Sequence, residues 1–460
     1  MKKLKNQLFS PAVILVLLAT LVACNSNQQK KEVKIKKQES MDADWSKNAN
    51  IYEVNIRQYT EEGTIKAFVE HLPRLQEMGV DILWIMPVFP VGELNRKGSL
   101  GSYYAVRDYK DINPEFGNIN DFKELVKKAH SLGMYVILDW VANHSAWDNQ
   151  WAEDHPEWYE RDSAGNLVSP FDWTDVISFE YNNPEMRDAM IDALKFWIAE
   201  ADIDGYRCDV AGMVPTDFWD RARDEMESIK PVFMLAEDED NPDLLRKAFD
   251  MNYAWKLHHL MNDIASGKKN ANDIWDYFVW NDSTYPSNAY RMYFTSNHDE
   301  NSWNGTVKER MGYAAEVMAV LSYTVPGMGL IYSGQEAGLD KRLRFFEKDT
   351  INWENLVYGD FYKTLNNLKK ENTALWNGDH GGPMTRIGDG LNQFVYALLR
   401  EKNDNKVIAI MNLSDKPQTI TFNQENLNGT YKNVFTGTDV IIDGEMTVEL
   451  QPWKYMVLSK

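Results

Sequence analysis

DGYRCDVAGMVPTDFWDRARDEMESIKPVFMLAE, residues 204–237, is the stretch that decides the fold. It opens with a short strand-like run, Asp204–Asp209, and closes with a second one, Val232–Glu237, which is apolar up to its last residue. A segment of helical length separates the two runs. A strand, a helix and another strand in succession are typical of a parallel sheet, because parallel strands need a long crossover. The stretch therefore predicts a βαβ unit with an acidic residue at the end of each strand.

The same alternation extends in both directions along the chain. Apolar residues at helical spacing between Ile65 and Met78 predict a helix after the first strand-like run. Eight strand-like runs with intervening helices over about 330 residues predict a closed (β/α)8 TIM barrel, an α/β fold. The runs are Ile51–Ile56, Asp81–Met86, Tyr135–Asp139, Asp204–Asp209, Val232–Glu237, Ala248–Asn252, Met292–Asn297 and Gly329–Tyr332.

Two regions depart from this rhythm. Residues 145–181 are too long for a plain connection and predict a small subdomain inserted after strand 3. After residue 375 the pattern changes to alternating residues with turns between, which predicts a C-terminal antiparallel β-sandwich domain over 376–460. We thus expect the catalytic barrel, with its insertion, to span 45–375. The strands expected in the C-terminal domain are Gln393–Leu399, Lys406–Asn412, Gln418–Phe422 and Met446–Leu450.

The N-terminus has the pattern of an exported protein. Three lysines precede an apolar run that ends at Ala23, which predicts a signal peptide over 1–23. The Leu-Val-Ala-Cys ending resembles the lipobox of bacterial lipoproteins and implies lipidation of Cys24. Residues 24–44 are polar and predict a flexible tether. We expect a chain anchored to a bacterial membrane, on its periplasmic face or at the cell surface.

Charge and cysteine content exclude some partners. The formal net charge of −20 disfavours binding to nucleic acid or to anionic lipid headgroups and suits neutral ligands such as sugars. The membrane is then contacted only through the anchor. The one other cysteine, Cys208, leaves no disulfide framework. The oligomeric state is left open by the sequence.

Three acidic residues end strand-like runs of the predicted barrel. Asp209, Glu237 and Asp299 follow three different runs, and strand ends of a TIM barrel meet at one face, where active sites form. Arg207 lies two residues before Asp209 and so on the same face of its strand. A pair of carboxyl groups, one ionised and one protonated, is what glycoside hydrolysis requires.

Four strand ends resemble the conserved motifs of the α-amylase family, glycoside hydrolase family 13. They are 139–144 (DWVANH), 205–209 (GYRCD), 234–237 (MLAE) and 294–299 (FTSNHD). The resemblance implies an α-glucan or maltooligosaccharide substrate and the roles that follow. Asp209 is the nucleophile, Glu237 the acid/base and Asp299 the residue that holds the distorted sugar, while the substrate-binding residues are Tyr104, His144, Arg207 and His298.

The chain also departs from the family pattern. Many members have Lys-His shortly after the nucleophile, whereas Val210 and Ala211 begin the segment here. The resemblance implies a calcium ligand at Asn143, but Ser178 stands where the insertion is expected to supply an Asp. Because calcium prefers several anionic oxygens, we expect no required cofactor.

The leading hypothesis is a retaining glycoside hydrolase that cleaves α-1,4-glucosidic bonds by double displacement, with the two carboxyl groups about 5–5.5 Å apart. A transglycosylase, or a family member acting on α-1,6 bonds or cyclodextrins, would share all of these residues. A non-catalytic glucan-binding lipoprotein is a third alternative, and the intact acidic trio argues against it. Endo or exo action and chain-length preference are left open.

Overall fold

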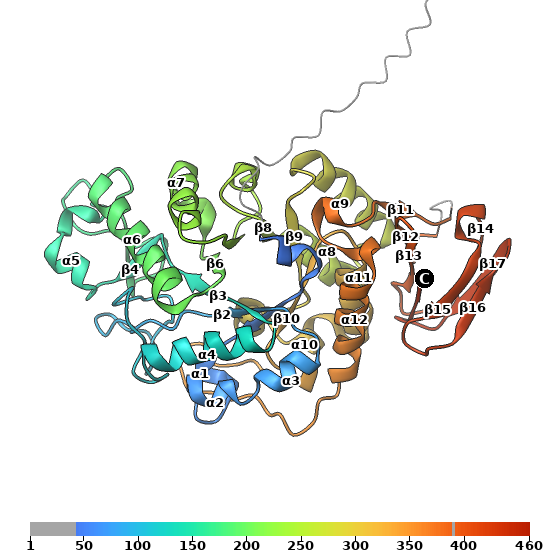
Figure 1. The fold of residues 1–460 in the computed structure, drawn as a ribbon, viewed down its shortest axis with the longest axis horizontal. Coiled ribbons are helices and arrows are strands. Elements are labelled where there is room, and N and C mark those ends of the chain that lie inside the picture. Colours follow the sequence, from blue (N-terminus) through green and yellow to red (C-terminus); the bar gives the residue numbers. More distant parts are fainter. Residues whose placement is uncertain (1–42, 389–391) are drawn as a thin grey trace, which may run out of the picture. The chain divides into compact units, whose positions relative to one another are not determined.

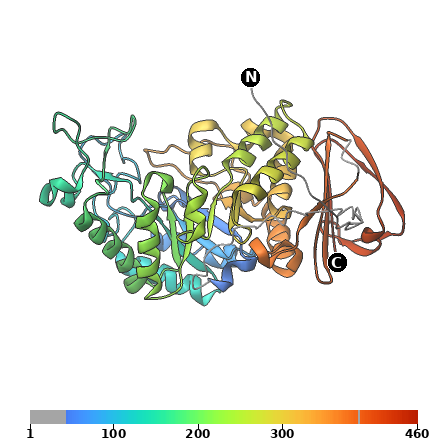
Figure 2. The same ribbon diagram turned by 90° about the horizontal axis from the view of Figure 1, so that it is seen from above.

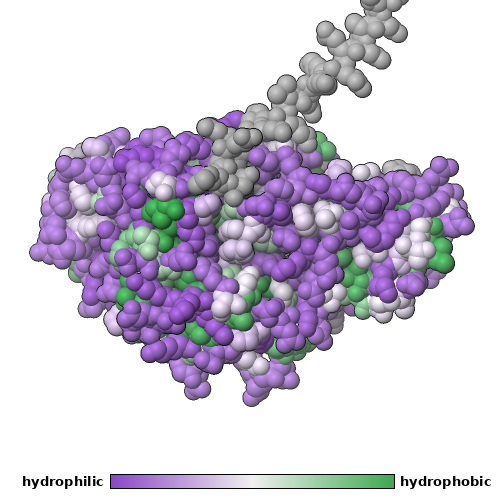
Figure 3. All heavy atoms as spheres, in the orientation of Figure 1, coloured by the Kyte–Doolittle hydropathy of each residue, from purple (hydrophilic) through white to green (hydrophobic). Residues whose placement is uncertain are grey.

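The computed structural model describes residues 43–388 and 392–460. The predicted signal peptide, Cys24 and nearly all of the predicted tether lie outside the described residues. Within those two ranges, no helix combines the length and the apolar character needed to cross a bilayer. The face drawn in Figure 3 is mostly hydrophilic, with small hydrophobic patches.

Eight parallel strands close into a barrel in the order β1-β10-β9-β8-β7-β6-β3-β2 (Figure 1). The predicted (β/α)8 fold is therefore confirmed. Nearly every residue of these strands is buried, as expected for a sheet that helices cover from outside. The strands are β1 (Ile51–Val54), β2 (Ile82–Ile85), β3 (Tyr135–Trp140), β6 (Gly205–Cys208), β7 (Phe233–Ala236), β8 (Met251–Tyr253), β9 (Tyr290–Tyr293) and β10 (Met328–Tyr332).

Helices surround the barrel and bury their apolar faces against it. In α4, Asn118 and Asp121 form a capping box that satisfies the first backbone N–H groups. The helices are α1 (Ile56–Tyr59), α2 (Ile65–Val69), α3 (Leu72–Glu77), α4 (Ile119–Ser131), α6 (Pro184–Ala201), α7 (Thr216–Glu227), α8 (Trp255–Ala265), α9 (Ala271–Thr284), α10 (Val307–Met311), α11 (Ala315–Thr324) and α12 (Gly359–Glu371).

The first predicted helix is in fact two helices. Its apolar spacing runs without interruption from Ile65 to Met78, but α2 ends at Val69 and α3 begins at Leu72. Pro73 lies in the first turn of α3, where a proline is tolerated because the N–H it lacks would have no helical partner. In one continuous helix the same proline would remove a backbone hydrogen bond to Val69.

The predicted bounds of several strands differ from those in the structure, and β8 and β9 are two examples. β8 begins at Met251 rather than Ala248, and β9 spans Tyr290–Tyr293 rather than Met292–Asn297. The pairing of β9 with β10 ends at Tyr293. The residues that follow are buried, although they are outside the ladder. Hydrophobicity therefore marked burial at these places and not strand pairing.

The segment between β3 and β6 forms a separate protrusion. It contains β4 (His144–Ala146), α5 (Gln150–Asp154) and β5 (Val176–Ser178), and β4 and β5 pair antiparallel. Trp151 stacks on Tyr109 of the preceding loop, with ring centroids 5.0 Å apart. The insertion is therefore packed against the barrel side that carries the strand ends.

The C-terminal strands form two antiparallel layers, drawn in red in Figure 2. A six-stranded sheet has the order β11-β12-β13-β18-β15-β16, and β14 pairs with β17. A second hydrophobic core that includes Ile408, Phe422 and Val448 joins the layers. The strands are β11 (Met384–Arg386), β12 (Val395–Lys402), β13 (Asn405–Asn412), β14 (Gln418–Asn423), β15 (Gly429–Asn433), β16 (Asp439–Ile442), β17 (Glu445–Leu450) and β18 (Tyr455–Ser459).

Candidate active site

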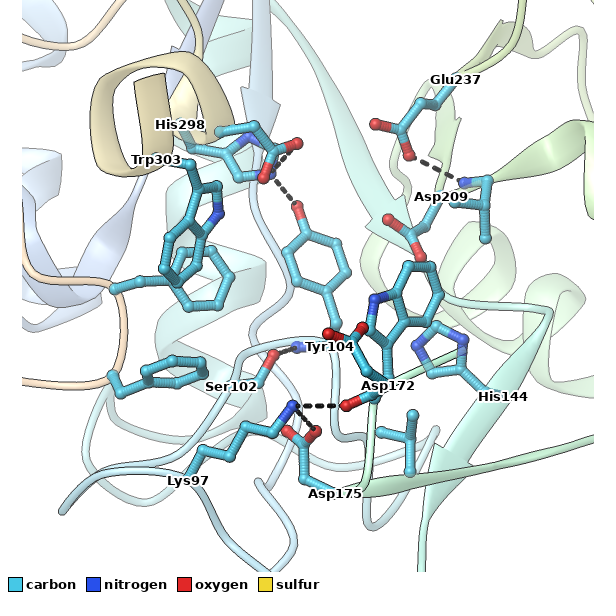
Figure 4. A pocket seen from close by; sticks show the side chains of 16 residues that line it. Lys97, Ser102, Tyr104, His144, Asp172, Asp175, Asp209, Glu237, His298 and Trp303 are labelled. Carbon is cyan, nitrogen blue, oxygen red and sulfur yellow. Dashed lines mark hydrogen bonds and ion pairs between the residues drawn. The ribbon is translucent and has the colours of Figure 1, made fainter. Parts of the chain in front are cut away.

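A cavity of about 440 Å³ opens at the carboxyl ends of the barrel strands (Figure 4). Asp209 directly follows β6 and Glu237 directly follows β7. Asp299 lies six residues after the end of β9, at the start of a helical turn, and not at a strand end as the sequence predicted. All three side chains nevertheless line the same cavity, so the structure brings the predicted acidic trio together.

One guanidinium group holds two of these acids and a third carboxylate. The Nη1 atom of Arg207 lies 2.9 Å from Asp209 Oδ1 and 2.9 Å from Asp139 Oδ1. Its Nη2 atom lies 2.9 Å from Glu237 Oε2. The Nε atom donates to the hydroxyl of Tyr253 at 3.2 Å. Since Arg207 is fully buried, these partners supply the stabilisation that water provides to an exposed cation.

The environment separates the two central carboxyl groups in acidity. Burial raises the pKa of Asp209 to about 6, while Arg207 opposes the shift. Burial raises the pKa of Glu237 to about 7; Arg207 again opposes it, and the charges of Asp209 and Asp299 add to it. Between these values Asp209 is ionised while Glu237 retains its proton. Two carboxyl groups with separated pKa values are suited to different chemical roles.

The backbone after β6 positions Glu237. Val210 has φ 37° and ψ 46°, a left-handed conformation that a β-branched residue rarely adopts. Its N–H group donates to Glu237 Oε2 at 2.8 Å. Asp209 donates its own N–H to the carbonyl of Trp140 at 2.8 Å. The turn thus fixes the nucleophile candidate and the acid candidate relative to each other. No signal in the sequence pointed to Val210.

A chain of hydrogen bonds next to the cavity determines the protonation of His298 and the direction in which the Tyr104 hydroxyl donates. His298 Nδ1 contacts Glu53 Oε1, and His298 Nε2 lies 2.8 Å from the hydroxyl of Tyr104. That hydroxyl donates to Asp139 Oδ2 at 3.1 Å. Burial by itself lowers the pKa of His298, but the charges of Asp299 and Glu53 outweigh it and raise the pKa to about 9. The imidazole ring is therefore a cation at neutral pH, with an N–H on each side.

Glu53 was missed by the sequence reasoning. It lies within β1, a strand whose other residues are apolar, and it is fully buried. A lone acid inside a strand was the signal that could have found it, since buried carboxylates need partners.

His144 and Asp299 complete the predicted site. Burial lowers the pKa of His144 to about 3, so this ring is neutral. Its Nδ1 atom accepts from the side-chain amide of Asn143 at 3.1 Å, which leaves the proton on Nε2. The Asp299 side chain is 34% exposed and lies 3.4 Å from His298 Nε2. Both residues line the cavity and leave a polar group free to contact a ligand.

Aromatic side chains form one wall of the cavity. We call Trp303, Phe345 and Phe346 the aromatic wall; their ring centroids lie 5.1 to 5.8 Å apart. Phe345 is stacked with Tyr104 at 6.3 Å, and Tyr104 with His298 at 5.5 Å. Trp303 is 52% exposed. Rings of this kind pack against the apolar faces of sugars.

Two protein-family models match the chain. The model described as "Alpha amylase, catalytic domain" matches residues 26–382, and the model described as "Cyclo-malto-dextrinase C-terminal domain" matches residues 392–459. The chain belongs to the α-amylase family. The resemblance stated from the strand-end motifs is thereby confirmed.

Relatives within the α-amylase family match over most of the chain. Alpha-amylase MalA of Haloarcula japonica is 26% identical over 393 residues, and the match covers 82% of this chain but 57% of MalA. The crystal structure of a noncanonic maltogenic alpha-amylase, AmyB from Thermotoga neapolitana, is 31% identical with a TM-score of 0.81, covering 90% of this chain and 98% of AmyB. The crystal structure of an alpha-amylase from Lactobacillus plantarum is 30% identical with a TM-score of 0.81, and the match covers 90% of this chain and 99% of the Lactobacillus chain.

The calcium site that membership in the α-amylase family implies does not fit the residues present. The side-chain amide of Asn143 donates to His144, and Ser178 is the partner of His144 in the antiparallel pairing of β4 with β5. Among residues 43–388 and 392–460, no three His, Cys, Asp or Glu side chains come together in a way that could hold a metal ion. A hard cation prefers several anionic oxygens, and Ser178 supplies no carboxylate where the insertion was expected to supply an Asp.

Proposed function

We propose that this member of the α-amylase family is a retaining glycoside hydrolase that cleaves α-1,4-glucosidic bonds in starch-like glucans or maltooligosaccharides. One observation carries the proposal: Asp209 and Glu237 lie on adjacent nitrogens of one buried guanidinium group and differ in pKa. A retaining mechanism needs a carboxylate nucleophile and a nearby carboxylic acid in such an arrangement.

The first displacement uses both groups. Asp209 attacks the anomeric carbon with a carboxylate oxygen, and Glu237 gives its proton to the glycosidic oxygen that leaves. Arg207 keeps Asp209 ionised up to the attack. The products are a β-linked glycosyl ester on Asp209 and a shortened glucan that carries the former Glu237 proton.

The second displacement reverses these roles. Glu237, now ionised, removes a proton from water, and the water oxygen attacks the anomeric carbon of the ester. Asp209 leaves as a carboxylate, so the α configuration is retained. The charges of Asp209 and Asp299, both of which raise the pKa of Glu237, help to restore its proton for the next cycle.

The remaining residues bind the sugar on which the displacement occurs. Asp299 is open enough to accept hydrogen bonds from sugar hydroxyls. Neutral His144 presents its Nε2–H to the cavity, and cationic His298 stabilises Asp299. Tyr104 offers its ring as a platform for the pyranose. Donors fixed in advance around the ring strengthen as positive charge develops on it.

A second candidate within the family is a cyclodextrin-acting enzyme. The match of residues 392–459 to a C-terminal domain named for cyclomaltodextrinases favours it. Transglycosylation and α-1,6 cleavage use the same catalytic residues. A transglycosylase differs in that a sugar hydroxyl replaces water in the second displacement, and an α-1,6-acting enzyme differs in which bond the cavity places beside Asp209 and Glu237. A non-catalytic binding protein is disfavoured, because it would have no need for the strained Val210 turn that holds Glu237.

The product stereochemistry and one matched pair of variants test the proposal. Wild-type protein incubated with maltoheptaose should release sugars whose first-formed anomer, read by proton NMR, is α. Asp209→Asn should abolish turnover, whereas Asp243→Asn, at an exposed Asp on a surface turn, should leave it unchanged. Equal activity of Asp209→Asn and wild type, or a β product, would rule out this mechanism.

We also propose that the chain is exported and anchored through a lipid on Cys24. The apolar run that ends in Leu-Val-Ala-Cys supports it. Cells expressing the full chain and given radiolabelled palmitate should incorporate label into wild type and not into Cys24→Ala. Unlabelled wild-type protein in the soluble fraction would contradict the anchor.

We propose further that activity requires no calcium. The poor fit of the Asn143 region to a hard cation supports it. Dialysis against EDTA should leave the rate of maltoheptaose hydrolysis unchanged. A loss of activity that added Ca²⁺ restores would contradict it.

A further inference from the structure

An ion pair links the insertion to the loop that follows β2. The loop over residues 94–100, called here the 94–100 loop, carries Lys97 to the rim of the catalytic cavity. Its Nζ atom lies 3.1 Å from Asp175 Oδ1 and donates to the carbonyl of Asp172 at 3.4 Å (Figure 4). The Asp175 side chain is only 6% exposed. An ion pair with a buried carboxylate holds its geometry better than a pair between two exposed chains.

The same loop is tied to the opposite wall. The N–H of Leu100 donates to the carbonyl of Phe346 at 3.0 Å, and the N–H of Ser99 donates to Glu347 Oε1 at 2.9 Å. Phe346 belongs to the aromatic wall. The 94–100 loop therefore connects the insertion on one side with the aromatic wall on the other, and residues of all three segments line the cavity.

The Lys97–Asp175 pair and Glu237 lie at opposite ends of the cavity. In Figure 4, Glu237 is at the top of the cavity and the Lys97–Asp175 pair at the bottom, with Asp209, Tyr104 and His144 at intermediate heights. The proposed acid protonates the leaving oxygen, so the leaving part of the glucan extends past Glu237. The part that becomes attached to Asp209 must then extend the other way, toward Lys97.

We propose that the Lys97–Asp175 bridge closes the non-reducing side of the cavity, so that the enzyme removes short units of fixed length from non-reducing ends of α-glucans. Lys97 is thus a specificity-determining residue. The inference rests on the proposed hydrolase function. A glucan bound at an internal bond would have to extend past the bridge on its non-reducing side. Because the bridge blocks that path, only bonds near a non-reducing end can reach Asp209.

The size and lining of the cavity agree with a short sugar. At about 440 Å³ it lies in the lower part of the range of small-molecule pockets, about 300–1,000 Å³. Asp172, Asp175 and Lys97 supply polar groups at the closed end, where a terminal glucose has a free hydroxyl instead of a further sugar. Phe346, which lies against Gly98 of the 94–100 loop, adds an apolar surface for the ring face.

The pattern of early products tests the inference. Maltoheptaose labelled at its reducing end with a fluorophore is digested, and the labelled fragments are separated at low conversion. Wild type should give one dominant labelled fragment, because a fixed short unit is removed from the unlabelled end. Labelled fragments of every length from the start would overturn the inference while leaving the hydrolase function intact. No cleavage at all would overturn the proposed function as well.

A ring substrate gives a second readout. The cyclodextrin with the same number of glucose units as maltoheptaose has the same bonds but no end. Wild type should hydrolyse it about tenfold more slowly than the linear sugar, or slower still, a discrimination that steric exclusion can supply. Equal rates on the two substrates would overturn the closure.

Variants assign the effect to the bridge. Lys97→Ala removes the bridge. It should give labelled fragments of a wider range of lengths and reduce the difference in hydrolysis rate between the linear and the cyclic substrate. Lys97→Met keeps most of the bulk without the charge, and Asp175→Asn removes the partner charge, so both should give intermediate patterns. Lys66→Ala, which breaks an ion pair with Asp121 on the barrel exterior, is the matched control and should behave as wild type. Unchanged products from Lys97→Ala, with wild-type thermal unfolding, would overturn the role of the bridge.

Discussion

Two fully buried arginines show how the same side chain serves opposite purposes in this molecule. Arg207, in the catalytic cavity, contacts the carboxylates of Asp139, Asp209 and Glu237. Arg400, on β12, donates to the carbonyls of Gly382 and Thr324.

Burial alone lowers the pKa of both guanidinium groups, but the result differs. At Arg207 the surrounding carboxylates outweigh burial and the pKa rises well above its usual value. At Arg400 no carboxylate compensates, and the pKa falls to about 10. Arg207 is therefore a permanent charge coupled to groups that titrate. Arg400 is a multiple donor that ties the C-terminal domain to the last residue of α11 and to the segment before β11. Burial of a charge does not by itself identify a functional site; the titratable partners do.

The largest loss of activity is expected from replacing Arg207, the arginine that contacts the titrating carboxyl groups. Arg207→Met removes the cation that directly contacts Asp139, Asp209 and Glu237, so Asp209 should become protonated at neutral pH. We expect kcat/KM on maltoheptaose to fall by about 10²–10³-fold or more, which is the scale for losing one preorganised charge contact. The free energy of unfolding should drop by about 3–5 kcal/mol in urea titrations, since buried charges lose their partner. Activity within tenfold of wild type would contradict the assigned role.

The pH profile should report the same coupling. Asp209 must be ionised to attack, so activity falls as the pH drops below its pKa of about 6. Glu237 must be protonated to donate, so activity falls as the pH rises above its pKa of about 7. We expect a narrow bell in kcat/KM with a maximum between about 6 and 7, falling about tenfold per pH unit on each side. A flat profile from pH 5 to 9 would show that these groups do not carry the proton transfers.

A smaller effect is expected from the carboxylate behind the cavity. In Glu53→Gln, His298 loses one of the two charges that raise its pKa to about 9. The pKa of His298, measured by NMR titration, should fall. The variant should keep activity at pH 6 and lose up to about tenfold at pH 8, where an uncharged ring no longer stabilises Asp299. An unchanged His298 titration would mean that Glu53 does not set its charge.

Activity should respond least to the structural arginine. Arg400→Met is the matched partner of Arg207→Met, because it makes the same replacement at an equally buried site. It leaves carbonyls without donors, so we expect unfolding free energy to fall by about 1–3 kcal/mol and kcat/KM to stay within about twofold of wild type. If Arg400→Met were as inactive as Arg207→Met, the distinction between the two sites would fail.

Much of the site followed from local pattern. Parallel strands meet at one edge, so acidic residues at successive strand ends were expected in one cavity, and Arg207 two residues before Asp209 was expected on the same face. These inferences need only strand periodicity and chain order. Asp299 was placed in the right cavity for a less accurate reason, since it follows a buried loop and not a strand.

Other features depend on contacts between segments far apart in the chain. Glu53 and His298 are separated by 245 residues, and no sequence pattern around either residue predicts the contact between them. The aromatic wall and the Lys97–Asp175 bridge are assembled in the same way, from loops after different strands.

The sequence by itself determined the barrel, the C-terminal β-domain, the α-amylase family and the acidic trio. These depend on periodicity and on short motifs, which can be recognised without knowledge of tertiary contacts. Only the tertiary structure decided which carboxyl group keeps its proton, how His298 is charged and which loops line the end of the cavity opposite Glu237. Acidity is set by burial and by charges a few ångströms away, and the lining of the cavity is set by loops that meet in space. Neither has a counterpart in the order of residues along the chain.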